Sequence, residues 1–216
     1  MTKKEIAKMI DHTLLKPATT AQIVKLCAEA KEYGFASVCV NPCHVKLAAK
    51  ELAGSKVKVC TVIGFPLGEN TTRTKVFETK EAIKNGATEI DMVMNQSLAK
   101  ANAWRKVTKD IAAVKKVCGH ILLKVILETC NLTQKQLIAA CNACIAAGAD
   151  YIKTSTGFGA GGATVEAVSL MADIAHPQGL KVKASGGIHN YEEAAEMIKN
   201  GADRIGASCG VAIVNE

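Results

Sequence analysis

The chain has 216 residues, of which 49% are hydrophobic and 22% are charged, and its formal net charge at pH 7 is +7. This length and apolar content fit one large domain with a buried core, and α/β barrels commonly have this size. Only 4% of the residues are aromatic, which argues against a protein that stacks RNA or single-stranded DNA bases on its side chains. The lysines are scattered, so the charge indicates a basic surface that suits small anions, and no nucleic-acid partner is expected.

The N-terminal residues MTKKEIAKMI lack the apolar core of a secretory signal, and no stretch approaches the ~18 apolar residues of a membrane span. We therefore expect a cytoplasmic protein with no membrane partner, whose nine cysteines stay reduced. The CxxC pair of Cys141 and Cys144 falls in a helical pattern, and Cys39, Cys43 and His44 match zinc spacing poorly. No bound metal is expected.

Eight short apolar runs rich in β-branched residues predict strands. They cover residues 10–14, 36–40, 57–65, 89–95, 121–129, 150–155, 180–185 and 203–208. Helical patterns separate them, and four of these end at a glycine placed as a C-cap, namely Gly34, Gly86, Gly148 and Gly201. Strands that alternate with helices predict a parallel sheet. Eight such units predict a closed (β/α)8 TIM barrel, with a short N-terminal helix, in a single domain over residues 1–216.

Charged residues interrupt four consecutive predicted strands at positions of one parity. Alternate residues of a barrel strand face the surrounding helices, and the others face the interior. The helix-facing set is apolar and comprises Ile90, Met92, Met94, Leu123, Val125, Leu127, Ile152 and Val182. The opposite parity places Asp91, Lys124, Lys153 and Lys183 inside the barrel.

One aspartate cannot neutralise three buried lysines, so a purely structural ion-pair network explains this pattern less well than a reactive site. Surplus buried positive charge is costly unless one lysine releases its proton. A lysine that is desolvated beside another cation becomes a nucleophile toward carbonyl carbons. Because the sixth and seventh strands are neighbours, we expect Lys153 and Lys183 to form such a pair.

Glycine-rich turns follow the last three strands, in the stretches STGFGAGGAT, SGGIHN and GASCGVAIV. Such turns expose backbone N–H groups, and short helices that start there present their positive ends to anions. Glycines also simply make tight turns, but a phosphate site after the last strands recurs in barrels. Together these turns predict a phosphorylated substrate.

Motifs along nearly the whole chain carry a family resemblance: IDHTLLKP, ASVCVNP, TVIGFPLG, EIDMV, LLKVILET, YIKTSTGF, VKASGGI and IGAS. With them the chain resembles the deoxyribose-phosphate aldolase family of class I aldolases, which have a (β/α)8 barrel. The resemblance implies reversible cleavage of 2-deoxy-D-ribose 5-phosphate to glyceraldehyde 3-phosphate and acetaldehyde, without metal or organic cofactor. The implied partners are phosphorylated sugars and aldehydes, with a homodimer as the assembly to test.

The same resemblance implies residue roles. Lys153, in KTSTG, would form the Schiff base; Lys183, in VKASGG, would be its charge partner and would donate and accept protons. Asp91, in EIDMV, would join the proton relay. Further contacts to the substrate or its phosphate would come from Lys124, Thr156, Gly157, Gly186, Gly187, Gly206 and Ser208.

Three places depart from the family pattern, and two other functions stay open. NQSLAKANAW, residues 95–104, replaces a more typical Asn-Ile-Gly-Ala-Leu stretch, Cys209 stands where serine or alanine is common, and His189 replaces a frequent arginine. One alternative is another Schiff-base aldolase or a transaldolase acting on a different sugar phosphate. The other is a barrel that only binds a sugar phosphate or a nucleic acid, for which the +7 charge is the sole support.

Overall fold

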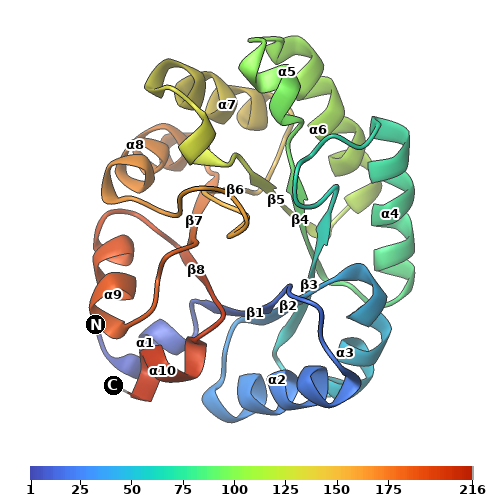
Figure 1. Cartoon of the computed structure of the whole chain (residues 1–216), viewed down its shortest axis with the longest axis vertical. Helices are drawn as coiled ribbons and strands as arrows, with labels where there is room; N and C mark the ends of the chain where they lie inside the picture. The colour runs from blue at the N-terminus through green and yellow to red at the C-terminus, as the bar shows by residue number, and fades with distance from the viewer. Residues whose placement is uncertain (216) are drawn as a thin grey trace.

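The computed structural model describes residues 1–215. Its eight parallel strands pair in chain order, and the last pairs with the first to close the barrel. They are β1 (Ile10–Leu14), β2 (Ser37–Val40), β3 (Lys58–Ile63), β4 (Glu89–Val93), β5 (Leu122–Ile126), β6 (Tyr151–Lys153), β7 (Lys181–Ser185) and β8 (Arg204–Ala207). The strands form a ring around the centre and the helices form an outer layer (Figure 1). The predicted (β/α)8 barrel is confirmed.

The outer layer begins with α1 and ends with α10, which lie side by side near the two termini (Figure 1). The helices are α1 (Lys3–Ala7), α2 (Thr20–Tyr33), α3 (Val45–Glu51), α4 (Thr72–Lys84), α5 (Gln96–Lys100), α6 (Trp104–Cys118), α7 (Gln134–Ala146), α8 (Val165–Ala175), α9 (Tyr191–Lys199) and α10 (Gly210–Asn215). The short N-terminal helix is confirmed as α1, which begins with a capping box at Thr2. Within residues 1–215, no helix is long and apolar enough to cross a membrane.

The helix ends follow the predicted glycines closely. Gly34 is the left-handed C-cap of α2, with φ of 69°. The other three come one residue later than predicted: Gly86, Gly148 and Gly201 follow the C-cap and adopt φ of 106°, 74° and 105°. Glycine suits these positions because it has no Cβ to oppose a positive φ.

Every predicted strand except the first is shorter in the structure, the third, the fifth and the sixth by the most residues, and the stretch 95–104 contains a helix that was not predicted. β3 stops at Ile63 because Gly64 turns to φ of 63°, and β5 stops at Ile126, two residues before Glu128, whose φ is 53°. The stretch 95–104 contains α5, because Asn95 caps it by accepting a hydrogen bond from the Leu98 amide at 2.8 Å.

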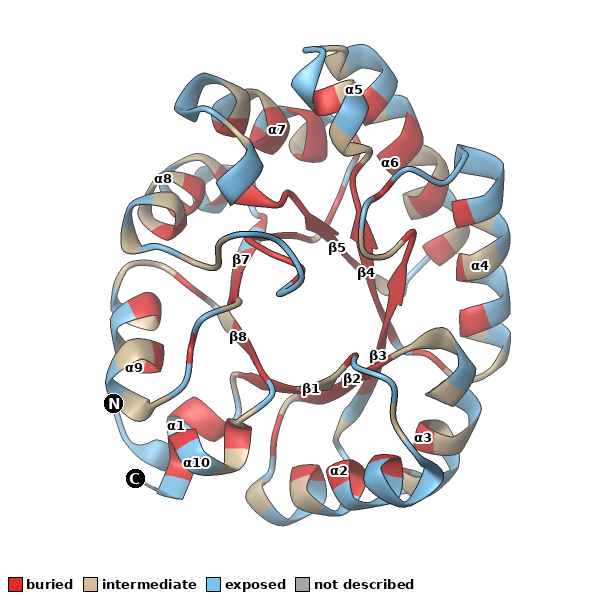
Figure 2. Cartoon of the chain, in the orientation of Figure 1, coloured by how far each residue is buried: buried red, intermediate tan, exposed pale blue. Residues whose placement is uncertain are grey.

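The predicted parity of the strands is confirmed. The apolar residues predicted to face the helices are all buried and belong to one core between barrel and helices. A separate small apolar cluster lies inside the barrel and contains Leu15, Cys39, Cys60 and Val62, with Phe65 against it. In Figure 2 the strands at the centre are buried, and the surrounding helices are exposed on the faces that point away from the barrel. The remaining interior is polar and holds the candidate site.

Candidate active site

The four charged residues predicted to face inward meet at one carboxylate. Lys124 donates a hydrogen bond to Oδ1 of Asp91 at 3.0 Å, while Lys153 and Lys183 donate to its Oδ2 at 2.9 and 2.8 Å. Asp91, Lys124 and Lys183 are fully buried, and Lys153 is 3% exposed. The two lysines predicted to form a pair therefore share a single oxygen atom.

Three further charged residues enlarge this cluster. Asp11 forms ion pairs with Lys183 and with Arg204, the latter at 2.6 Å. Glu89 contacts Lys124 at 2.5 Å and Arg204 at 3.0 Å. The cluster thus contains four cationic side chains and three carboxylates, so the surplus is one positive charge.

The sequence argument balanced three lysines against one aspartate and missed these three residues. Glu89 lies two positions before Asp91 on the same strand, so the period of two could have revealed it. Arg204 likewise lies two positions before Gly206 on β8, and Gly206 was expected to face the site. Asp11 carried no clear signal, because its strand has polar neighbours on the helix-facing side as well.

Electrostatic contacts fix the charge of most cluster members. Burial opposes the charged form of Lys183, but the carboxylates of Asp11 and Asp91 outweigh it and raise the pKa of Lys183. Burial likewise opposes the charged form of Lys124, yet Asp91 and its neighbours raise the pKa of Lys124 well above the usual value. Burial alone would raise the pKa of Asp91, but the three lysines hold it well below its usual range. Asp91 is therefore a carboxylate, and both deeply buried lysines are ammonium ions, at neutral pH.

Lys153 differs from the other lysines in its partners. Among the described residues, Lys153 forms an ion pair with one carboxylate, Lys183 with two and Lys124 with three. Lys153 is thus the buried lysine of this cluster with the fewest carboxylate partners.

An open cavity of about 520 Å³ lies directly above Lys153 at the carboxyl ends of the strands. Lys153 lines it, whereas Asp91, Lys124 and Lys183 do not and lie beneath it. The other predicted substrate contacts all line this cavity: Thr156, Gly157, Gly186, Gly187, Gly206 and Ser208. Of the predicted substrate-binding residues, Lys124 alone is separated from it, because its amine is engaged by Glu89 and Asp91.

Gly206 has a second role beside the cavity. A Cβ at this position would lie 2.9 Å from Cβ of Ser185 and 3.0 Å from Cε of Lys183. Any larger residue would push against the Lys183 side chain, which is fixed between its carboxylates. The absence of a side chain at Gly206 therefore gives Lys183 its room.

Two exposed polar residues of the cavity wall carried no assigned role in the sequence argument. Lys16, just after β1, and His189, after β7, both line the cavity and are exposed. Lys16 follows the first strand, whose loop was not considered as part of the anion site. The IDHTLLKP motif contains it and could have drawn attention to it.

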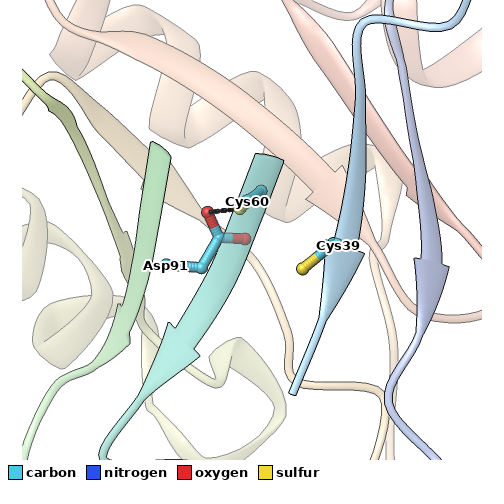
Figure 3. A group of neighbouring side chains, drawn as sticks. All are labelled: Cys39, Cys60 and Asp91. Carbon is cyan, nitrogen blue, oxygen red and sulfur yellow. Dashed lines mark hydrogen bonds between the residues drawn. The ribbon is translucent and has the colours of Figure 1, made fainter. Parts of the chain in front are cut away.

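Two groups of thiol and carboxylate atoms inside the barrel have the spacing of metal ligands. In one, the ligand atoms of Cys39, Cys60 and Asp91 lie within 4.8 Å of one another, and the Cys60 thiol donates to Asp91 at 3.1 Å (Figure 3). The other group consists of Asp11, Cys60 and Glu89. Every carboxylate in them already binds a cationic side chain, and burial raises the pKa of Cys60 well above its usual value, so it stays a thiol. These residues do not fit a metal ion.

A barrel with an amine at the floor of a cavity, above a buried relay of charges, has the architecture of a carbon–carbon lyase of the aldolase class. The profile of the DeoC/LacD family aldolases matches residues 5–215. The chain belongs to this family.

Individual relatives agree over the full length. The deoxyribose-phosphate aldolase of Caldanaerobacter subterraneus subsp. tengcongensis is 58% identical over 225 residues, with 100% of this chain and 97% of the relative covered. That of Clostridium kluyveri is 57% identical, with both chains covered completely. The solved structure of deoxyribose phosphate aldolase from Aeropyrum pernix, described as a tetramer, is 35% identical with a TM-score of 0.93, covering 99% of this chain and 91% of the other.

Proposed function

We propose that this aldolase cleaves 2-deoxy-D-ribose 5-phosphate reversibly to glyceraldehyde 3-phosphate and acetaldehyde, with Lys153 as the Schiff-base lysine. One observation carries the role of Lys153: of the buried lysines in residues 1–215 it alone reaches the cavity, and it is the cation that gives the charge cluster one positive charge more than its carboxylates balance. The substrate follows from the names of relatives nearly 60% identical over the whole length. The whole chain acts as one catalytic domain.

The chemistry begins at the amine of Lys153. The neutral amine attacks the C1 aldehyde of the open-chain sugar, and loss of water from the carbinolamine gives an iminium ion. When the C3 hydroxyl loses its proton, the C2–C3 bonding electrons move toward the iminium nitrogen, so C3 leaves as the aldehyde carbon of glyceraldehyde 3-phosphate. The remaining enamine takes a proton at C2, and hydrolysis releases acetaldehyde and restores Lys153.

Asp91 and Lys183 supply a path for the protons of these steps. Both Lys153 and Lys183 donate to Oδ2 of Asp91, so a proton can pass between the two amines through one oxygen atom. Asp11 and Asp91 hold Lys183 as an ammonium ion in the resting site.

The phosphate group of the substrate fits the part of the cavity wall that the glycine-rich segments form. Gly186 and Gly187 from the turn after β7, Gly206 from β8 itself and Ser208 just after β8 line the cavity there, and the turn after β6 adds Thr156 and Gly157. Turns of this kind offer backbone N–H groups to an anion. Lys16, from the end of β1, brings an exposed positive charge to the same wall.

Trapping with borohydride tests this proposal directly. Acetaldehyde and borohydride are expected to add one ethyl group to the protein, because the reductant fixes the imine between Lys153 and the aldehyde. Intact mass measurement followed by peptide mapping locates the label. A label found only on surface lysines, or on Lys183, contradicts the role of Lys153.

Donor specificity separates this function from that of another Schiff-base aldolase or a transaldolase. Each of these enzymes would form an imine at Lys153, but the carbonyl compound that becomes the enamine differs from one enzyme to the next. Turnover with acetaldehyde and not with dihydroxyacetone as donor is the pattern that agrees with the proposed substrate.

Chelators are expected to leave activity unchanged. The iminium ion withdraws the electrons that a metal would otherwise withdraw, and both thiol–carboxylate groups are occupied by cationic side chains. Activity is measured after prolonged treatment with EDTA, before and after adding zinc. A loss that zinc reverses would contradict the absence of a metal from the mechanism.

The proposed location is the cytoplasm, and the proposed assembly is a homo-oligomer, with a homodimer expected first. The A. pernix relative is described as a tetramer. A mass measurement in solution distinguishes the two assemblies.

A further inference from the structure

Glu128 is a buried carboxylate outside the charge cluster, in a backbone conformation that residues other than glycine rarely adopt. It is 2% exposed, and its φ and ψ are 53° and 65°. Within residues 1–215, no lysine, arginine or histidine forms an ion pair with it. Burying a carboxylate without a cation and holding it in the left-handed region are both costly. A functional role would account for the Glu128 side chain at this unfavourable position.

Within residues 1–215, the side-chain hydrogen bonds of Glu128 all go to the turn that follows the Schiff-base strand. Its Oε1 accepts a hydrogen bond from the backbone N–H of Thr156 at 3.2 Å, and its Oε2 accepts a short one from the Thr156 hydroxyl. The hydroxyl oxygen in turn accepts from the N–H of Phe158 at 3.0 Å. A Cβ at Gly159 would lie 3.1 Å from the carboxylate carbon, so the turn passes directly over Glu128.

The left-handed turn of Glu128 is what aims the carboxylate at Thr156. On either side of it, the backbone stays bonded to the neighbouring segment: Leu127 N–H to the Lys153 carbonyl at 2.9 Å, and Thr129 N–H to the Thr154 carbonyl at 3.0 Å. The backbone on both sides of Glu128 is therefore held by hydrogen bonds beyond the end of β5, while its own side chain is directed toward the next turn. The strained backbone of Glu128 therefore positions its carboxylate against Thr156.

The turn that Glu128 holds forms part of the cavity wall. Residues 156–158 line the cavity, beginning three positions after Lys153. The loop after β6 bends inward over the barrel centre, and much of its surface is exposed (Figures 1 and 2). Its other side is fixed by Ser185, whose N–H donates to the Thr154 hydroxyl oxygen at 3.0 Å. Without Glu128, the turn would lose its anchor on the β5 side.

We propose that Glu128 is a positioning residue that holds residues 156–158 in the geometry that binds the phosphate-bearing half of the substrate. The inference rests on the proposed function, because Thr156 and Gly157 are assigned there to substrate binding. Glu128 does not touch the reacting carbons; it acts through Thr156.

The role requires a carboxylate and not merely a polar group. A glutamine has one acceptor oxygen and one NH2 group, so one of the two Thr156 donors would face a donor. The Thr156 hydroxyl could turn to accept from the NH2 group, but its own proton would then be unpaired. In the first arrangement Glu128→Gln loses one hydrogen bond to the turn, and in the second it leaves the Thr156 hydroxyl proton without an acceptor. In both, hydrogen bonds to a charged group, which are the stronger ones, are replaced by hydrogen bonds to a neutral group.

The test compares three variants with the parent: Glu128→Gln, Thr156→Val and the double variant. Glu128→Gln is expected to raise KM for 2-deoxyribose 5-phosphate roughly tenfold. Its borohydride trapping with acetaldehyde, which lacks a phosphate, should stay near the parental rate. Because both side chains act through one contact, the double variant should lose little more than Thr156→Val alone. Thr79→Val is the structural control: the Thr79 hydroxyl is buried in α4 and donates to the Lys75 carbonyl at 2.7 Å, so this variant should lower the melting temperature without changing KM.

Each outcome tests either the positioning role of Glu128 or the proposed function. A parental KM in Glu128→Gln, or effects of Glu128→Gln and Thr156→Val that simply add, overturns the positioning role. So does a pattern like that of Thr79→Val, in which only the melting temperature falls. A parent protein that traps no imine at Lys153 contradicts the proposed function instead, which keeps the two failures apart.

Discussion

Asp91→Asn is expected to lower both stability and turnover more than any other single change at a carboxylate of this barrel. The substitution leaves four cations, three of them buried lysines, facing two carboxylates, and breaking a buried ion pair in this way typically costs about 3–5 kcal/mol. Three lysines donate to Asp91, one to Oδ1 and two to Oδ2. An asparagine would present an NH2 group to at least one of them. Turnover should fall by roughly 10²–10⁴, the usual contribution of a positioned acid–base group.

The shifted pKa of Asp91 also determines how its contribution to stability changes with pH. Burial would raise the pKa of Asp91, but the three lysines hold it well below its usual range in the folded state. The stability that Asp91 contributes is therefore fully present above the unfolded value of about 3.9 and is lost as the pH falls through the folded value. Unfolding by denaturant, measured from pH 7 downward, should show a smaller loss on acidification in Asp91→Asn than in the parent.

A matched control separates stability from chemistry. Asp110 and Lys75 form another buried ion pair, at 2.7 Å, between α6 and α4 and away from the cavity. Asp110→Asn should also destabilise the protein, yet it should leave the turnover of the folded fraction unchanged. Asp91→Asn with parental stability and turnover would show that Asp91 neither balances the lysines nor serves the relay.

The period of two along a strand explains why much of the site could be predicted from the sequence. Apolar neighbours at Ile90, Met92 and Ile152 fix which side faces the helices, so Asp91 and Lys153 must face inward. The closed ring then brings inward residues of different strands together without further information. The glycine-rich turns were equally visible, because glycine signals both a turn and a place where backbone meets a ligand.

The parts that escaped prediction depend on side-chain geometry rather than on pattern. Arg204 has the inward parity, but it stands at the start of its strand, where the sequence does not show which carboxylates its long side chain reaches. Glu128 requires a left-handed backbone at a residue other than glycine, and nothing in the sequence marks such a position. Asp11, Glu89 and Arg204 together change the conclusion in number rather than in kind, since the surplus falls from two positive charges to one. One neutral lysine is then enough to balance the interior.

Lys183→Leu is expected to reduce the rate by about 10²–10³ through the charge balance alone. The parent has four cations and three carboxylates in the cluster. Removing Lys183 leaves three of each, so Lys153 no longer has to release its proton. A lysine free in water is only about 0.1% neutral at pH 7.5. The neutral amine that attacks the substrate would become correspondingly scarce, and trapping with acetaldehyde should recover only as the pH is raised.

Lys183→Arg separates the charge of Lys183 from its part in proton transfer. Arginine keeps the count of four cations to three carboxylates, so Lys153 should still form a borohydride-trappable imine at neutral pH. A guanidinium group does not release a proton near neutrality, and its planar fork fits the space beside Gly206 poorly. If Lys183 also passes protons through Asp91, as proposed, turnover in Lys183→Arg should be nearly as low as in Lys183→Leu despite the preserved imine. If Lys183 acts through its charge alone, Lys183→Arg should be clearly the more active variant, with a pH optimum close to that of the parent. Trapping and turnover are measured on both variants over the same pH range, and near-parental turnover in Lys183→Leu would contradict the pairing of the two lysines itself.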